Sequence, residues 1–568
     1  MPPERARTAA GLGDGNDHSL NSNEENVKSA AVVLSVLMVP GLLYGQVGNV
    51  RIDKPGTNQP EEVTIAINPV DPMNLAAGSN LDYYYYSTDG GNTWQQGRLQ
   101  STWGVWGDPC VVYDSKGNLY YGHLSRGIGG YFLDRIIVQK STDGGASWNS
   151  GAGVGYNPPV REQDKEWLAA DLTNSSYHDN LYMAWTQFDS YGSADPKDSS
   201  RILFSRSTDG GINWSVPLPV SDRAGDCLDS DSTDEGAVPA VGPNGEVYLS
   251  WSGPLGIVFD RSLDGGVTFG KDVFVTSQPG GWDFDVSGIY RANGMPVTAC
   301  DISNSSHRGT IYICWSDQRN GADNTDIFLV RSLDGGTSWS APARVNDDPT
   351  ATHQFFVWMT IDQSTGYLYF VFYDRRGTVG DATDVYCARS TDGGETFTNF
   401  KVSDSSFTPT KGVFFGDYIN IAAANGRVYP IWMRLDTTRL SVWTALITET
   451  TGIAEGEGGV SEESFKLGQN YPNPFNPSTR IKYTVAGVRG QGPGVGEAGA
   501  GVSGLGTSKT SLIVYDLLGR EVAVLVNERQ APGSYEVRFD ASGLASGVYY
   551  YRLAAGSFIQ TRKMILIK

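Results

Sequence analysis

STDGGNTW, at Ser87–Trp94, is the first of six nearly identical octapeptides. The others begin at Ser141, Ser207, Ser262, Ser332 and Ser390, at intervals of 54, 66, 55, 70 and 58 residues. The shared aspartate can accept backbone N–H groups inside a turn, and the two glycines can adopt positive φ angles. We therefore predict six structural hairpin turns, each closed by an aromatic ring that packs on a sheet. Their aspartates are Asp89, Asp143, Asp209, Asp264, Asp334 and Asp392.

Each octapeptide follows three segments with the alternation of short strands. Around the second octapeptide these segments are PCVVYD, LYYGHLS and RIIVQK, and turn-rich letters such as DSKGN join the first two. A period near 50 to 60 residues with strand-like content is typical of a β-propeller, which has one small antiparallel sheet per period. The sequence therefore predicts an all-β propeller.

A seventh set of strands lacks the octapeptide. It consists of DYINIAAA (Asp417–Ala424), VYPIWMR (Val428–Arg434) and LSVWTALIT (Leu440–Thr448). Conversely, NVRIDKPG (Asn49–Gly56) stands alone before the first set and matches ARVNDDPT (Ala343–Thr350), an outermost strand. We predict that the N-terminal segment supplies the missing strand of the last blade, which closes a seven-bladed ring and protects its edges. A six-bladed ring with one decorated insertion is the alternative.

The composition and the N-terminal segment limit the class of protein. The chain has 568 residues and a formal net charge of −20, so we expect no nucleic-acid partner. An apolar run at Val27–Gln46 predicts a signal peptide, at residues 1–46 with an atypical polar extension, and the mature chain should have no membrane span. The five cysteines fit no zinc pattern; buried free thiols are preferred over a Cys300–Cys314 pair.

The octapeptides resemble the Asp-box, or BNR, repeat of sialidase-like β-propellers, and the resemblance covers residues 47–448. It implies the propeller fold, and it implies that the repeated turn lies away from any catalytic centre. Sialidases of this kind use three arginines, an acid aspartate and a tyrosine assisted by a glutamate. The first arginine normally sits in an R-I-P stretch, whereas this chain offers Arg51-Ile52-Asp53. The set is therefore incomplete.

A second domain follows a Gly- and Glu-rich linker at residues 449–466. Residues 467–568 alternate as short strands with frequent turns, which predicts a small Ig-like β-sandwich. YPNPFNP (Tyr471–Pro477), VYDLLGREV (Val514–Val522) and the basic end RKMILIK (Arg562–Lys568) resemble the type A sorting domain of the type IX (Por) secretion system. The resemblance implies passage through the periplasm, a translocon and a sortase as partners, and a secreted or outer-membrane location.

Candidate site residues come from the innermost strand of each blade. Alignment on the following turn glycine (Gly117, Gly245 and Gly426) gives equivalent positions at Asp108, Gly236 and Asp417. Matching the other inner strands by eye adds Glu62, Lys165, Met295 and Phe356. Glu62, Asp108 and Asp417 belong to neighbouring blades once the ring closes, and we predict an arc of candidate catalytic carboxylates at one mouth. Such carboxylates can divide acid and base roles, or hold a cation. A one-residue slip would substitute Asp164, Glu166 or Glu235.

Further candidates surround this arc. Lys165, Arg161, Arg291 and Tyr418 are predicted ligand-binding residues, because they lie at or near the inner strand entrances. DSDSTDEG (Asp229–Gly236) has spacing like that of a calcium loop, with Asp229, Asp231 and Asp234 as oxygen ligands, so Ca²⁺ is an alternative although no cofactor is required.

Three functions remain open from the sequence, and the last of them is a structural role in a surface layer. The first is a secreted or cell-surface protein that binds a glycan or a protein at the propeller mouth. The alternative is a secreted, sialidase-like glycoside hydrolase that uses the channel carboxylates. Carboxyl groups that face an open cleft would favour hydrolysis, and carboxyl groups plugged by other side chains would favour binding.

Overall fold

The computed structural model describes residues 48–125, 133–155, 161–448, 466–468, 470, 472–485, 508–517, 519–531, 533–555 and 558–568. The chain divides into two compact units, residues 1–454 and residues 455–568. The predicted signal peptide lies outside the described residues, and so do residues 449–465 of the predicted linker. No helix long and apolar enough to cross a membrane occurs in the described ranges.

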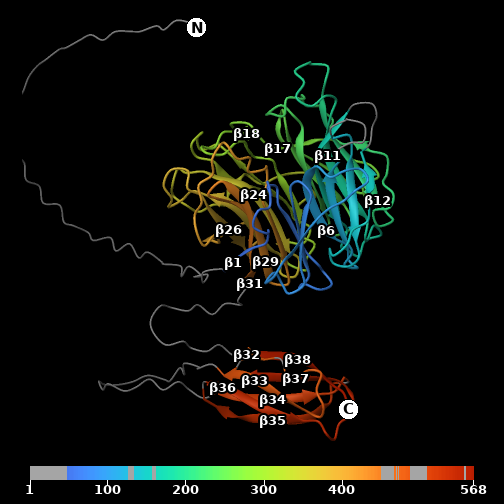
Figure 1. Cartoon of the computed structure of the whole chain (residues 1–568), viewed down its shortest axis with the longest axis vertical. Helices are drawn as coiled ribbons and strands as arrows, with labels where there is room; N and C mark the ends of the chain where they lie inside the picture. Colours follow the sequence, from blue (N-terminus) through green and yellow to red (C-terminus); the bar gives the residue numbers. More distant parts are fainter. Residues whose placement is uncertain are drawn as a thin grey trace, which may run out of the picture. The chain divides into compact units, whose positions relative to one another are not determined.

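Seven antiparallel sheets form the blades of the first unit (Figure 1). Blade 1 contains β2 (Thr64–Ile67), β3 (Leu75–Ser79), β4 (Tyr83–Ser87) and β5 (Gln95–Arg98), and blade 2 contains β6 (Gly107–Tyr113), β7 (Leu119–Leu124), β8 (Ile136–Ser141) and β9 (Ala152–Val154). Blade 3 contains β10 (Glu162–Ala170), β11 (Leu181–Phe188), β12 (Ser200–Ser207) and β13 (Leu218–Pro219), and blade 4 contains β14 (Glu235–Val241), β15 (Val247–Gly253), β16 (Gly256–Ser262) and β17 (Val273–Thr276).

The remaining blades follow the same order. Blade 5 contains β20 (Val297–Cys300), β21 (Ile311–Asp317), β22 (Asp326–Ser332) and β23 (Ala343–Arg344), and blade 6 contains β24 (Gln354–Asp362), β25 (Tyr367–Asp374), β26 (Asp384–Ser390) and β27 (Thr398–Lys401). Blade 7 contains β28 (Asn420–Ala424), β29 (Arg427–Asp436), β30 (Arg439–Ala445) and β1 (Asn49–Arg51), and β31 (Ile447–Thr448) also pairs with β29. A small hairpin of β18 (Asp283–Phe284) and β19 (Ala292–Asn293) connects blades 4 and 5.

The ring closes through the N-terminal strand. β1 pairs antiparallel with β30, in the register Asn49↔Ala445, Val50↔Thr444 and Arg51↔Trp443. The first strands of successive blades contact one another around the ring, and β28 contacts β2. The seven-bladed prediction is therefore confirmed, and the six-bladed alternative is wrong because each set of strands forms a separate sheet.

The core lies between the blades. Four second strands each place a tryptophan with no more than 1% of its surface exposed, and these residues are Trp185, Trp251, Trp315 and Trp432. All five cysteines are buried free thiols. Cys300 pairs with Ile311 and Cys314 pairs with Val297 across β20 and β21, so the alternative disulfide is wrong.

The octapeptide turns share one hydrogen-bond pattern. In the fourth turn, Asp264 Oδ1 accepts the backbone N–H groups of Val267 (3.0 Å) and Thr268 (2.9 Å), and its Oδ2 accepts the Thr268 hydroxyl (2.6 Å). The Ser262 hydroxyl donates to the same carboxylate at 2.7 Å. Burial alone would raise the pKa of Asp264, but these hydrogen bonds lower it to about 2.

Replacing Asp264 by alanine should lower the free energy of unfolding by about 1 kcal/mol at pH 7, because a partly exposed carboxylate loses its donors. Since the folded-state pKa is depressed, this stabilisation is present above the ordinary aspartate pKa of 3.8 and is lost as the pH falls toward about 2. Denaturant unfolding at pH 7 and pH 3 measures the difference, with the exposed Leu263→Ala as control. A difference that does not change with pH would contradict this origin.

The second unit is a two-sheet sandwich. One sheet is β32 (Lys466–Leu467), β33 (Ser478–Val485) and β36 (Gly533–Asp540). The other is β35 (Glu521–Gln530), β34 (Ser508–Tyr515), β37 (Gly547–Ala555) and β38 (Phe558–Leu566). Phe475, Ile481, Leu512, Tyr551 and Met564 belong to the buried core between them. The all-β prediction is thus confirmed for this unit as well.

Candidate functional site

A β-bulge opens the innermost strand of several blades. The pairing register shifts between Gly107 and Cys110, between Asp164 and Trp167, between Glu235 and Val238, and between Phe355 and Trp358. Five of the seven aligned positions have positive φ angles: Glu62 (56°), Asp108 (50°), Lys165 (52°), Gly236 (78°) and Phe356 (53°). A left-handed conformation costs a non-glycine residue about 1–2 kcal/mol. Such strain and such bulges are both concentrated next to functional sites.

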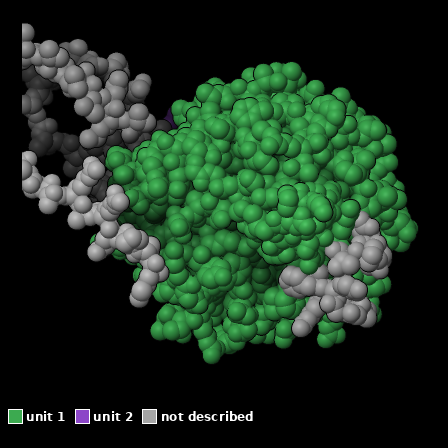
Figure 2. Space-filling view, turned by 90° about the horizontal axis from the view of Figure 1, so that it is seen from above, with its two compact units in different colours: residues 1–454 green, residues 455–568 purple. Residues whose placement is uncertain are grey.

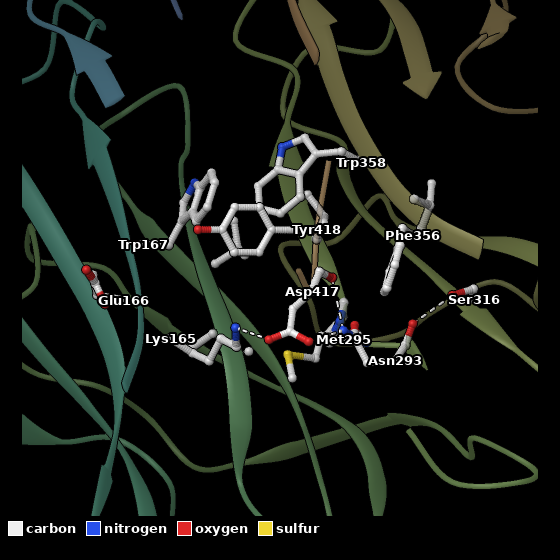
Figure 3. A pocket seen from close by; sticks show the side chains of 16 residues that line it. Lys165, Glu166, Trp167, Asn293, Met295, Ser316, Phe356, Trp358, Asp417 and Tyr418 are labelled. Carbon is white, nitrogen blue, oxygen red and sulfur yellow. Dashed lines mark hydrogen bonds and ion pairs between the residues drawn. The ribbon is translucent and has the colours of Figure 1, made fainter. Parts of the chain in front are cut away.

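The three predicted carboxylates lie around one lysine. Lys165 Nζ lies 3.4 Å from Glu62 Oε1 and 3.4 Å from Asp108 Oδ2, and it also contacts Asp417 Oδ2. Figure 3 shows the contact between Lys165 and Asp417. The Lys165 side chain is only 8% exposed, and that of Asp417 is 1% exposed. We call Glu62, Asp108 and Asp417 the inner acid cluster.

Other side chains hold the inner acid cluster in place. Arg291 Nε donates to Asp417 Oδ1 at 2.9 Å, and its Nη2 contacts Oδ2 of the same carboxylate. The Asn80 amide donates to Glu62, while its Oδ1 accepts the backbone N–H of Asp108 at 2.9 Å. Two cations and an amide therefore connect the three acids into one buried network.

The charges in this network differ between the carboxyl groups. Burial raises the pKa of Glu62 well above its ordinary value, and the nearby carboxylate of Asp108 raises it further. Burial would also raise the pKa of Asp417, but Arg291 and Lys165 outweigh that effect and hold it well below its ordinary value. Lys165 stays charged, because its three acidic neighbours outweigh its desolvation. The inner acid cluster therefore combines two carboxyl groups whose pKa values shift in opposite directions, upward for Glu62 and downward for the ion-paired Asp417.

A small cavity lies beside this network. Its volume is about 40 Å³, and its lining includes Lys165, Asp417, Met295 and Phe356 (Figure 3). Trp167, Trp358 and Tyr418 pack together at one side of it, with ring centroids 4.2 to 5.9 Å apart. A cavity of this size holds a few water molecules. It does not hold a sugar ring.

The other predicted ligand-binding residues divide into two groups. Arg291 joins the inner acid cluster and remains 31% exposed. Arg161 instead pairs with Asp189 at 2.9 Å, away from the cluster. The Tyr418 hydroxyl is buried and donates to the backbone carbonyl of Pro109 at 3.2 Å, and the ring lies 5.5 Å below Lys165 Nζ. Tyr418 is thus part of the packing around Lys165.

The predicted calcium ligands do not converge. Asp229 pairs with Arg291, Asp231 accepts the backbone N–H of Asp283 at 2.9 Å, and Asp234 is buried elsewhere. Within the described ranges, no three acidic, histidine or cysteine side chains are arranged to hold a metal ion.

The sequence analysis did not predict that a second set of acidic residues would lie together. Asp164 and Glu235, which the sequence analysis named only as one-residue alternatives, both interact electrostatically with Asp229, although the charge that acts most strongly on Asp164 is that of Asp108. Burial raises the pKa of the Tyr191 phenol, and Asp164, Asp229 and Glu235 each raise it further. The Tyr191 hydroxyl donates to Asp229. We call Asp164, Asp229 and Glu235 the outer acid cluster. Arg291 Nη1 reaches it at 3.0 Å from Asp229 Oδ2, so Arg291 bridges the two clusters.

Comparison with known families identifies the domain in the second unit. Residues 469–568 match the model described as "Secretion system C-terminal sorting domain". The second unit carries a sorting domain. This sorting domain directs the chain through type IX secretion to the cell surface or outside the cell. It therefore interacts with the secretion machinery.

The propeller is similar to several solved structures at low identity. An ulvan lyase of polysaccharide lyase family PL25 is 13% identical, with 71% of this chain and 96% of that chain covered and a TM-score of 0.42. The arabinofuranosidase Arb93A of Fusarium graminearum is 16% identical (62% and 97%, TM-score 0.39), and a Trypanosoma rangeli sialidase is 11% identical (92% and 89%, TM-score 0.39). No curated protein matches the chain.

Proposed function

We propose that this chain is a secreted or cell-surface binding protein that recognises a glycan at the mouth of its propeller. The observation that carries the proposal is the position of Lys165 Nζ, in contact with all three predicted catalytic carboxylates. Carboxyl groups buried in such a network are not free to act as acid and base on a sugar.

We also propose that the octapeptides are Asp-box repeats, because their aspartates accept hydrogen bonds within the turns.

The chemistry around Arg291 favours a glycan. Its guanidinium is part-exposed and lies 5.3 Å from the Phe414 ring, which packs edge-on against Tyr290 at 5.9 Å. Tyr290 is 63% exposed. Aromatic faces pack on the C–H faces of sugars, while guanidinium and carboxylate groups hydrogen-bond hydroxyls. Figure 2 shows the unit of residues 1–454 from above, in green.

Arg291→Ala should weaken glycan binding at least about tenfold, because a charged hydrogen-bond donor is removed from the mouth. The measurement is binding of the exported propeller to an array of neutral, acidic and amino glycans, with thermal melting of the variant as a check on folding. Arg98→Ala is the matched control, since Arg98 is exposed and pairs with Asp82 in blade 1. Binding of proteins but of no glycan would replace the glycan by a protein ligand. Unchanged glycan binding by Arg291→Ala would contradict the proposed site.

A sialidase-like glycoside hydrolase is the second candidate. The observation that favours it is the close approach of Glu62 and Asp108, because a buried carboxyl with a raised pKa is what a general acid requires. Release of a fluorogenic leaving group from sialosides and neutral glycosides tests this activity. Hydrolysis by the wild type that disappears in Asp108→Asn would favour the hydrolase over the binding protein.

A further inference from the structure

A second cavity lies between blades 2 and 3, at the end of the inner strands that is farther from the mouth. Its volume is about 470 Å³, within the range of about 300–1,000 Å³ that is usual for small-molecule sites. Asp108 of the inner acid cluster lies at the start of β6, whereas Asp114 follows the end of β6 and lines this cavity. β6 spans seven residues, which corresponds to about 20 Å of extended strand. The cavity is therefore separate from the inner acid cluster.

One wall of the cavity joins the β6–β7 turn to the β10–β11 turn. Lys116 Nζ pairs with Asp179 Oδ2 at 2.7 Å, and the backbone N–H of Ser115 donates to Asp179 Oδ1 at 3.1 Å. His178 Nδ1 donates to the backbone carbonyl of Thr173, so Nε2 of the neutral ring accepts the Ser115 hydroxyl at 3.0 Å. These contacts hold the wall in shape without a ligand.

Lys140 contributes a charged group that has no anionic partner. It lies near the end of β8 and lines the cavity together with Gly210 of the third octapeptide. A Cβ atom at Gly210 would lie only 3.1 Å from Lys140 Nζ, so the glycine leaves space beside the ammonium group. Within the described residues, the Lys140 side chain makes no ion pair or hydrogen bond, and its Nζ lies 5.0 Å from the ring centroid of the buried Tyr120. Its three N–H donors are therefore available to a ligand.

Equivalent positions in later blades show that this arrangement is particular to blade 2. The residue before the octapeptide serine is Arg206 in blade 3 and Arg331 in blade 5. Arg206 donates to the carbonyl of Gly265 at 3.1 Å, and Arg331 donates to the carbonyl of Gly393 at 2.9 Å. Each of these glycines belongs to the octapeptide of the next blade. The arginines thus join neighbouring blades, whereas Lys140 makes no such bond in the described part of the chain.

The carboxylates around the cavity already have donors. Asp114 is 3% exposed and accepts hydrogen bonds of 2.7 to 3.0 Å from donors of its own hairpin. The more exposed Asp209 accepts backbone and side-chain donors of the octapeptide turn, and Asp179 pairs with Lys116. The group without a partner is therefore the ammonium of Lys140. The three carboxylates would repel a ligand with several negative charges.

We propose that this cavity binds a sugar unit that carries one negatively charged substituent, a carboxylate or a sulfate, and that Lys140 donates to that substituent. Lys116 has N–H donors beyond the one directed at Asp179, and it can donate to the same sugar. The exposed Thr208 hydroxyl and the Asp209 carboxylate can exchange hydrogen bonds with ring hydroxyls. This site is additional to the proposed glycan site at the mouth and does not depend on it.

The lining favours a sugar over an acidic peptide. Apart from Gly210 and the Tyr120 ring, the described residues that line the cavity have polar or charged side chains, and none is aliphatic. Sugar hydroxyls both donate and accept, so they match this mixture of donors and acceptors. The side chains that flank an acidic residue in a peptide would find no apolar contact here.

The test compares three sugars that share one ring. Titration calorimetry at pH 7 and low ionic strength measures binding of glucuronate, glucose 6-sulfate and glucose to the intact exported chain. We expect at least one of the two anions to bind the wild type at least about tenfold more tightly than glucose, because only an anion forms the charge-assisted hydrogen bond. The anion that binds more tightly identifies the substituent. Lys140→Met should remove the preference over glucose.

Lys271→Met is the matched control, because it also removes one positive charge, from a side chain that is 87% exposed and pairs with Asp222 outside the cavity. It should keep the preference of the wild type. If thermal melting shows that Lys140→Met fails to fold, Lys116→Gln is the second variant, and it should weaken binding of the anions severalfold.

Three results would overturn the inference: equal binding of the three sugars, no binding of any of them, or a preference that Lys140→Met retains. Tighter binding of the capped peptide Gly-Glu-Gly than of either anionic sugar would overturn it in favour of a protein ligand. The proposed function is tested separately by Arg291→Ala, and Arg291 does not line this cavity.

Discussion

Lys165→Met should lower the free energy of unfolding of the propeller by about 3–5 kcal/mol at pH 7, because it leaves buried carboxyl groups without their cation. The loss should be smaller in acid. Lys165 and Arg291 depress the pKa of Asp417, so the stabilisation that Asp417 contributes is present above the ordinary pKa of 3.8 and is lost as the pH falls through the depressed value. Denaturant unfolding between pH 7 and pH 3 measures both effects.

The matched control is Lys271→Met. The Lys271 side chain is 87% exposed and pairs with Asp222 at 2.6 Å, so its loss should change stability by no more than about 0.5 kcal/mol. A Lys165→Met protein as stable as the wild type would mean that the inner acid cluster is fully protonated and needs no cation. The three carboxyls would then be available as proton donors, and the hydrolase would become the better proposal.

Much of the ring could be predicted from the sequence. The octapeptide turns are local, since Ser87 and Asp89 bond within their own hairpin, so their letters are sufficient to indicate the structure. The number of blades followed from one missing strand. The inner-strand positions matched in the sequence also share a backbone conformation, because Glu62, Asp108 and Lys165 all have positive φ angles near 50°.

The electrostatic state of the site could not be predicted from the sequence. Asp164 and Lys165 are neighbours in the chain, yet Lys165 pairs with the inner acid cluster, whereas Asp164 accepts the backbone N–H of Lys165 at 3.0 Å. Arg291 reaches Asp417 from the β18–β19 hairpin, across 126 residues of chain. No period or spacing specifies where such an excursion ends. Burial of the carboxyls is a property of all seven blades together.

Deletion of Asn49–Asp53 should be more destabilising than any substitution of a single residue within it. Ile52 is 3% exposed, and Ile52→Ala alone should lower the free energy of unfolding by about 2–5 kcal/mol. The deletion also removes the hydrogen bonds from Ile52 N to Val442 O (2.9 Å) and from Val442 N to Asp53 Oδ1 (2.9 Å), and it exposes the edge of β30. Thermal and denaturant unfolding measure the loss, with Val216→Ala, at a site 87% exposed, as control.

A peptide of residues 47–57, added in trans, should bind the deleted protein and restore part of its melting temperature, because β1 contacts the ring through β30 and is not covalently joined to it there. The same peptide with Ile52→Asp should not restore it, since the buried position cannot accept an unpaired charge. If the deleted protein melts like the wild type, β1 does not close the ring. The absence of a seventh octapeptide would then have no physical reason, because blade 7 would need a hairpin of its own to reach an outermost strand.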